Sequence, residues 1–184
     1  FDRSVECEGG GRFCFPRVSC RAGHADHEYN KQNVIDIIIR EFDKRDAETV
    51  SRLIRNNLTF VNSRDYEPTV INYMCRLFTP DYLCEISATR TMFVAEENGK
   101  VVGTVGLEGD EVCALYVDPD VHGRRVGERL LQRIEDFALS CHVHLLHLSA
   151  SLTAIGFYEK MGYRSQEKEE SELFGPAYIM TKLL

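Results

Sequence analysis

Two rhythms of apolar and polar residues follow one another along the chain, one typical of strands and the other of helices. Residues 34–42, VIDIIIREF, alternate with Ile35, Ile37 and Ile39 on one face, which predicts a strand. Asp43 then offers an N-cap, and residues after it recur at helical spacing. This predicted helix carries on one side Ala47, Val50, Leu53, Ile54, Asn57, Leu58 and Val61.

Prolines open two further predicted helices, because proline fits the first helical turn. Pro68 begins a helix whose apolar positions are Val70, Ile71, Met74, Leu77 and Phe78. The pair Thr79-Pro80 begins a third, shorter helix.

The next segment predicts strands joined by tight turns. Asn98-Gly99 lies between the apolar runs MFVAEE and VVGTVGL, and Asn-Gly in this setting is a strong signal for a two-residue hairpin. After Glu108-Gly109-Asp110 comes the run EVCALYV. We therefore expect three strands in an antiparallel meander.

The C-terminal part alternates between helix and strand. A helix is predicted over residues 126–141, and VHLLHLSA (143–150) predicts a strand buried on both faces. AIGFYEK predicts a short helix, and AYIMTKLL a last strand. Residues 34–184 thus predict one α/β domain with a single mixed, largely antiparallel sheet flanked by helices. Residues 1–33 show neither rhythm, so we expect a flexible leader or an artificially added segment.

Charge narrows the possible partners. The net charge of −7 belongs to residues 34–184, which hold 17 basic and 24 acidic residues. General nucleic-acid binding is disfavoured, since it needs a basic face, whereas a cationic partner is favoured. Apolar runs stay well short of the ~20 residues that cross a bilayer, so no membrane span is predicted.

The cysteines and histidines predict neither a disulfide framework nor a metal site. Seven cysteines occur without a CxxC pair. We expect buried free thiols and a reducing, cytoplasmic compartment. In a regular strand His142 and His144 share one face and His147 lies on the other, so these three histidines cannot bind one metal ion. The cysteines are Cys7, Cys14, Cys20, Cys75, Cys84, Cys113 and Cys141.

VDPDVHGRRVGERLL, residues 117–131, joins a predicted strand directly to a predicted helix. The first N–H groups of a helix lack intrahelical partners and favour anions. Gly123 and Gly127 would let a phosphate approach the backbone, and Arg124 and Arg125 add charged donors. The segment is therefore typical of a diphosphate site. The alternative is a tight connection whose two arginines are only solvated.

This loop and ASLTAIGFYEKMGY (150–163) together resemble the GNAT superfamily of acyl-CoA-dependent N-acyltransferases, over roughly residues 34–184. The family motif Q/R-x-x-G-x-G/A falls on residues 122–127. His122 replaces its Gln or Arg, and Arg125 replaces its first glycine. Ser151 stands where many relatives have an asparagine.

The resemblance implies that acetyl-CoA is the acyl donor and binds where two strands of the sheet splay apart. Backbone groups of residues 115–117 would then pair with the pantetheine arm, and residues 122–128 would hold the diphosphate. The implied donor-binding residues are Leu115, Tyr116, Val117, His122, Gly123, Arg124, Arg125, Val126, Gly127, Glu128 and Ser151.

The resemblance also implies a catalytic base and acid for transfer to a primary amine. A lysine-like amine has a pKa of about 10.4, so a base must remove its proton. Glu111, eleven residues before His122, is the candidate base, with Glu108 and Asp110 as rivals. Tyr158 is the candidate acid for the departing thiolate; the alternative is an aromatic side chain that only packs.

The acceptor is less defined. Residues 62–91 correspond to the region that roofs the acceptor pocket in relatives, with Asp65, Tyr66, Tyr82 and Glu85 as candidate lining. A small molecule or a peptide would supply the amine, and a homodimer is expected by analogy. Two alternatives stay open: a non-catalytic acyl-CoA-binding sensor with the same fold, and a regulatory protein that binds another nucleotide between Gly123 and Gly127.

Overall fold

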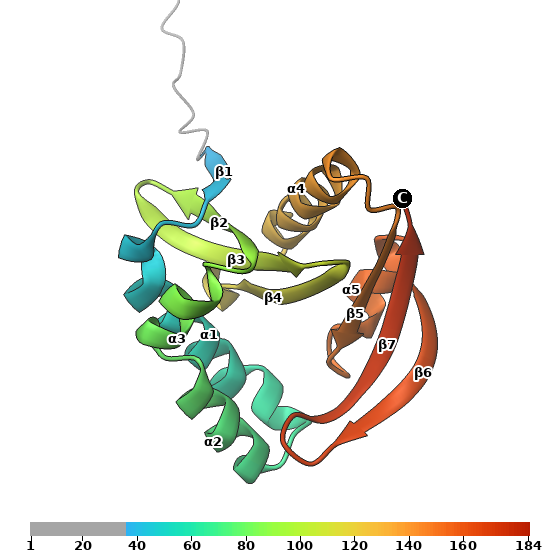
Figure 1. Ribbon diagram of the computed structural model, residues 1–184. Helices are drawn as coiled ribbons and strands as arrows, with labels where there is room; N and C mark the ends of the chain where they lie inside the picture. Colours follow the sequence, from blue (N-terminus) through green and yellow to red (C-terminus); the bar gives the residue numbers. More distant parts are fainter. Residues whose placement is uncertain (1–35) are drawn as a thin grey trace, which may run out of the picture. The chain divides into compact units, whose positions relative to one another are not determined.

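A computed structural model describes residues 36–184, so the predicted leader, with its three cysteines, and the start of the first predicted strand lie outside the described residues. The described part forms one seven-stranded sheet in the order β1-β2-β3-β4-β5-β7-β6 (Figure 1). Neighbouring strands are antiparallel except β4 and β5, which are parallel. The strands are β1 (Ile37–Glu41), β2 (Thr91–Glu97), β3 (Lys100–Glu108), β4 (Glu111–Val117), β5 (Leu145–Ala150), β6 (Arg164–Ser171) and β7 (Gly175–Leu183).

Helices lie between the strands where the sequence predicts them. Pro68 and Pro80 each occupy the first turn of a helix, and the Thr79 side chain accepts a hydrogen bond from the N–H of Tyr82. Asp43 caps a short 3-10 turn, Lys44–Asp46, that leads into α1. The helices are α1 (Ala47–Phe60), α2 (Pro68–Leu77), α3 (Pro80–Ile86), α4 (Val126–Ser140) and α5 (Ile155–Lys160). None of the helices within residues 36–184 is long and apolar enough to cross a bilayer.

Two apolar layers cover the two faces of the sheet, because strand residues alternate between them. In β2, Phe93 and Ala95 pack with α4, whereas Met92 and Val94 pack with α1 and α3. Figure 1 shows α4 apart from the group formed by α1, α2 and α3. We call these the α4 face and the α1–α3 face of the sheet.

The predicted fold class is confirmed, as is the antiparallel meander over β2, β3 and β4. Asn98 and Gly99 both have positive φ, as the predicted tight turn requires. The strand β6 was missed, because its sequence RSQEKEES contains no apolar residue and its residues are nearly all exposed.

Two details of the β5 prediction are wrong. The strand begins at Leu145 rather than residue 143, so His142 and His144 precede it and the argument from strand alternation does not apply to them. Only one face of β5 is buried: Leu146, Leu148 and Ala150 face the core, while Leu145 and Ser149 are exposed. The four cysteines within the described residues are free, but none is fully buried as expected: Cys75, Cys84 and Cys113 are partly buried, and Cys141 is exposed.

Candidate functional site

The sheet opens between its two parallel strands. β4 and β5 pair at a single position, Glu111 with His147, where the N–H of His147 also donates to the carbonyl of Asp110 at 3.1 Å. β5 is paired on its other edge with β7 along its whole length. Figure 1 shows β4 and β5 diverging from their contact. The rest of β4 therefore has a strand partner on the β3 side only.

The backbone of Val117 points into this opening. Val117 lies opposite Gly103 in β3, and the next N–H, of Asp118, donates to the carbonyl of Val102 at 2.8 Å. Antiparallel pairs alternate in their hydrogen bonding, so the N–H and C=O of Val117 point away from β3 and those of Tyr116 point toward it. Of these two predicted pantetheine contacts, Val117 turns its N–H toward the opening, with its carbonyl in contact with His122, and Tyr116 turns neither group that way.

A β-bulge lies immediately before these residues. Ala114 and Leu115 together oppose Val105, and Ala114 has φ 49°. The extra residue in a bulge has no partner in the opposite strand. The bulge also changes which face the side chains occupy: Cys113 faces the α1–α3 side, whereas Leu115 packs with the α4 cluster.

His122 bonds to β4 rather than to solvent. Its Nε2 lies 3.0 Å from the carbonyl oxygen of Val117, and because a carbonyl only accepts, Nε2 carries the proton. The side chain predicted to belong to the phosphate loop thus ties that loop to the edge of the opening.

The first turn of α4 offers a row of free donors. The N–H of Arg129 is the first to reach back along the helix, to the carbonyl of Arg125 at 3.1 Å. The N–H groups of Val126, Gly127 and Glu128 have no acceptor within residues 36–184. Unpaired N–H groups at a helix start are suited to bind an anion, and they lie where the sequence predicts a diphosphate site.

Gly127 allows α4 to approach the sheet closely. A Cβ at this position would lie 3.4 Å from the ring of Phe157 and 3.6 Å from Val117. A larger residue would push the helix start away from β4 and α5. Gly123, with φ 77° and no atom within 4 Å of a Cβ position, instead supplies the turn.

The two arginines of the loop differ in their surroundings. Arg124 binds Glu97 of the β2–β3 hairpin through both terminal nitrogens, one at 3.2 Å, so it offers a phosphate less than the sequence suggests. Arg125 is 81% exposed along its side chain, and its Nε lies 3.7 Å from Glu128. Arg125 is therefore the more exposed and more loosely held of the two arginines. Ser151, at the end of β5, has its hydroxyl 3.3 Å from that of Thr153.

Tyr158 is buried, with its ring centroid 5.1 Å from that of Phe157 and 5.7 Å from that of Tyr163. Burial, together with the neighbouring Tyr116 and Cys113 of β4, raises the pKa of Tyr158 well above its ordinary value. The phenol therefore stays protonated at neutral pH and faces β4. It makes no hydrogen bond to any residue that the structure describes, so its proton is not already engaged.

Glu111 is half-buried at the point where β4 and β5 meet. Of its rivals, Glu108 already accepts a hydrogen bond from Nε of Arg90 at 2.6 Å, and Asp110 is exposed in the turn. His147 shares the face of Glu111, because the two residues are paired. The sequence did not single out His147 as a neighbour of Glu111, since only the strand register brings them together.

The candidate acceptor residues divide into two groups. The hydroxyl of Tyr66 donates to the carbonyl of Pro176 at 2.9 Å, and one oxygen of Asp65 is buried without a partner among the described residues. Tyr82 packs edge-on against Phe78, which in turn packs against Tyr116 of β4. Glu85, on the same helix as Tyr82, is exposed. Residues 36–184 contain no group of three or more His, Cys, Asp or Glu side chains arranged to hold a metal ion.

A family model described as "Acetyltransferase (GNAT) domain" matches residues 88–165. The peptidyl-lysine N-acetyltransferase YjaB of Salmonella typhimurium is 32% identical over 92 residues, which cover 45% of this chain. The matched part spans 56% of that relative.

Solved structures show the same fold. A GCN5-related N-acetyltransferase from Rhodopseudomonas palustris has a TM-score of 0.75 at 23% identity, covering 80% of this chain and 95% of its own. The PaiA N-acetyltransferase of Thermoplasma acidophilum, solved in complex with coenzyme A, has a TM-score of 0.71 at 18% identity and covers 81% and 99%. Residues 88–165, the part that matches the GNAT acetyltransferase family model, include the opening of the sheet, the loop before α4 and Tyr158.

Proposed function

We propose that the protein is an N-acetyltransferase that moves an acetyl group from acetyl-CoA to a primary amine of a small molecule or peptide. The observation that carries the proposal is the opening between β4 and β5, with the free donors of α4 close to the outward-facing backbone of Val117. An amide-bearing arm can pair with that strand edge while its diphosphate meets the helix start.

Residues at the opening supply the groups that the reaction needs. Glu111, directly or through water, takes a proton from the acceptor ammonium, and the free amine attacks the thioester carbonyl carbon. The C–N bond forms and the C–S bond breaks. Tyr158 gives its proton to the departing sulfur, and the amide nitrogen passes its surplus proton to the Tyr158 oxygen, directly or through water, so the products are the neutral amide and CoA with a free thiol. The backbone N–H of Val117, which faces the opening, would stabilise the oxyanion.

The raised pKa keeps Tyr158 protonated at neutral pH, so a proton is present for the departing thiolate, but the same shift makes this phenol a weaker acid than an ordinary tyrosine. A CoA thiolate is already a fair leaving group, so the acid assists the step rather than making it possible. The contribution of a general acid is typically 10²- to 10⁴-fold, and we expect the lower end of that range.

The test is acetyl-CoA-dependent acetylation of an amine panel, followed by CoA release and by the mass of the product. Tyr158→Phe should lower kcat by roughly 10²-fold and leave the KM for acetyl-CoA unchanged. Tyr73→Phe is the matched control, because Tyr73 lies on α2 with its ring against Phe174. Acetyl-CoA binding without transfer to any amine would favour the non-catalytic sensor, and an unchanged Tyr158→Phe would remove the acid from the mechanism.

A further inference from the structure

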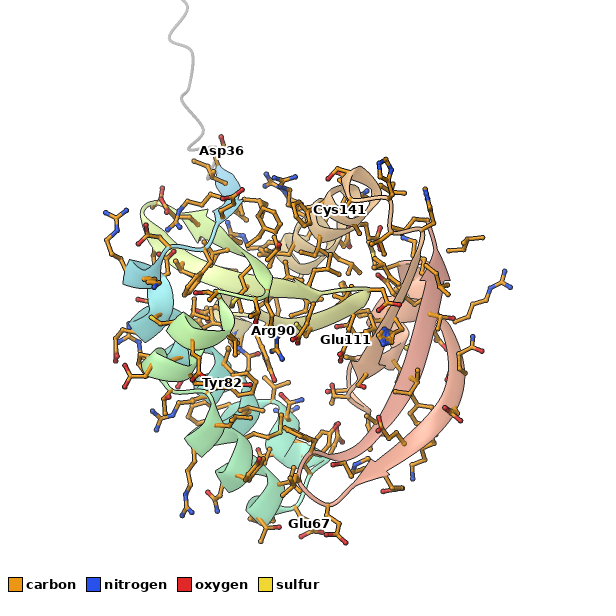
Figure 2. The ribbon with its side chains drawn as sticks, viewed as in Figure 1. Asp36, Glu67, Tyr82, Arg90, Glu111 and Cys141 are labelled. Carbon is orange, nitrogen blue, oxygen red and sulfur yellow. The ribbon has the colours of Figure 1, made fainter. Side chains whose placement is uncertain are left out.

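Arg90, which the sequence did not suggest, lies in one cross-strand row with the candidate base. Thr91 pairs with Leu107 and Glu108 pairs with Glu111, so Arg90, the residue just before β2, lies next to Glu108 of β3, which in turn lies opposite Glu111 of β4. Alternation along each strand places all three on the α1–α3 face, with Met92 and Cys113 in the neighbouring row. Figure 2 shows Arg90 and Glu111 beside the opening next to β4.

One nitrogen of the Arg90 guanidinium is hydrogen-bonded to a neighbouring side chain, and the other two remain available to a ligand. Its Nε donates to Glu108 at 2.6 Å, and its side chain is only 23% exposed. The two terminal nitrogens have no acceptor within residues 36–184. Burial lowers the pKa of Arg90, but the neighbouring Cys113 and the bond to Glu108 outweigh it, so the group stays charged.

Arg90 also has Cys113 of β4 as an electrostatic neighbour. Its guanidinium is close to Cys113, which immediately precedes the bulge of β4. The thiol of Cys113 is also a neighbour of the Tyr158 hydroxyl and of the Glu111 carboxylate. The backbones of Arg90 and Glu111 are separated by two strand spacings, or about 10 Å. The long arginine side chain can span part of that distance.

A base and a fixed cation at this separation complement an acceptor that carries both charges. Resting on the proposed transfer reaction, we propose that the acceptor is an amine with a carboxylate close to it, of the α-amino acid class, and that Arg90 binds the carboxylate while Glu111 receives the amine. The terminal N–H groups of an arginine match a carboxylate geometrically. A diamine would place a second cation against Arg90, so the site disfavours it despite the acidic balance of the chain.

The test compares amines that differ only in the carboxylate: phenylalanine with phenethylamine, and leucine with 3-methylbutylamine. We expect the amino acid of each pair to have the lower KM, by roughly 10- to 100-fold, as for a charged hydrogen bond. Arg90→Met should abolish the difference within each pair, and Arg90→Lys should keep part of it. Arg52→Met, an exposed arginine on α1, is the control and should change neither member.

A second readout separates this inference from the proposed function. If amines are acetylated equally with and without the carboxylate, the acceptor inference is wrong and the transferase stands. If nothing is acetylated, the acceptor inference is tested by binding. The shift in the melting temperature of the protein is measured with each amino acid and each matching amine in the presence of CoA. A shift that phenylalanine produces, phenethylamine does not, and Arg90→Met loses would support the Arg90 site. Equal shifts from both compounds would overturn it.

Discussion

Arg125 shows how much one backbone conformation matters at the start of α4. Arg125 has φ 60°, in the left-handed region, at the position where the GNAT motif has its first glycine. For a residue other than glycine, that conformation is less stable by roughly 1–2 kcal/mol. Within residues 36–184 its one ionic contact, to Glu128 at 3.7 Å, lies on the surface and adds little stability. The chain therefore keeps a strained arginine where it can reach an anion.

Arg125→Gly should separate strain from ligand binding. We expect the free energy of unfolding to rise by about 1 kcal/mol, because glycine adopts positive φ without strain. Acetyl-CoA affinity should fall at the same time if the guanidinium contacts a phosphate. Urea unfolding and a binding titration on the same sample measure the two effects. Arg124→Gly, at a position without positive φ, should only destabilise; a similar gain in both variants would rule out relief of strain at Arg125.

Sequence reasoning found the residues that lie in motifs and missed those that only the register assembles. The glycines and arginines of residues 123–127 and Tyr158 could be predicted from local pattern. Arg90 and His147 could not, because they meet Glu111 across strand pairs that no local pattern encodes. The side-chain partner of Arg124, Glu97, is equally remote in sequence.

At the scale of elements, β4 is the strand whose behaviour departs most from simple alternation. A regular strand would put Cys113 and Leu115 on one face, but the bulge at Ala114 moves them to opposite faces. EVCALYV predicts a strand without indicating this change. The bulge matters because it sets Leu115 and Val117 toward α4 and α5, and Tyr116 toward Phe78.

The packing of α4 on β3 sets the position of the helix start, and Gly103 controls it. A Cβ there would lie 2.8 Å from Cδ1 of Leu130 and 3.2 Å from the carbonyl oxygen of Tyr116. Gly103→Ala should therefore cost about 1–3 kcal/mol of stability by forcing α4 or β4 to shift. Gly156→Ala, where nothing lies within 4 Å, should instead stabilise α5 slightly. Urea unfolding of both variants checks this, and a neutral Gly103→Ala would show that the contact relaxes freely.

In the whole described domain, few direct links join β1–β4 to the β5–β7–β6 part of the sheet, since β4 and β5 pair at one position. A buried ion pair adds a link besides this single strand pairing. Nζ of Lys182 on β7 lies 2.8 and 2.7 Å from the two carboxylate oxygens of Glu135 on α4. On the opposite face, Tyr66 reaches Pro176 at the start of β7. These contacts hold the two parts together around the opening.

Lys182→Met tests the ion pair. It leaves Glu135, which is 3% exposed, as an unpaired buried charge, so we expect a loss of about 3–5 kcal/mol. The double variant Glu135→Leu with Lys182→Met should recover most of that loss, since no charge then remains buried. Denaturant unfolding of the three proteins gives the comparison. A small loss in the single variant would mean that water reaches Glu135.

Buried tyrosines make the domain sensitive to alkali. Burial raises the pKa values of Tyr116, Tyr158 and Tyr163 above the ordinary value of about 10. The unfolded chain therefore loses these protons first, and stability that is present below pH 10 is lost as the pH rises beyond it. Denaturant midpoints should be steady below pH 10 and fall above it. Tyrosine ionisation that precedes unfolding would contradict this.

The most direct test of the account is a calorimetric titration with acetyl-CoA and, separately, with ATP. We predict that acetyl-CoA binds and that ATP does not match it. Gly127→Trp should abolish binding, because its side chain would collide with Phe157 and Val117, whereas Leu139→Trp, exposed at the other end of α4, should bind normally. Circular dichroism confirms that both variants fold. Absence of heat with acetyl-CoA, or equal binding of ATP, would contradict the donor site between β4 and β5.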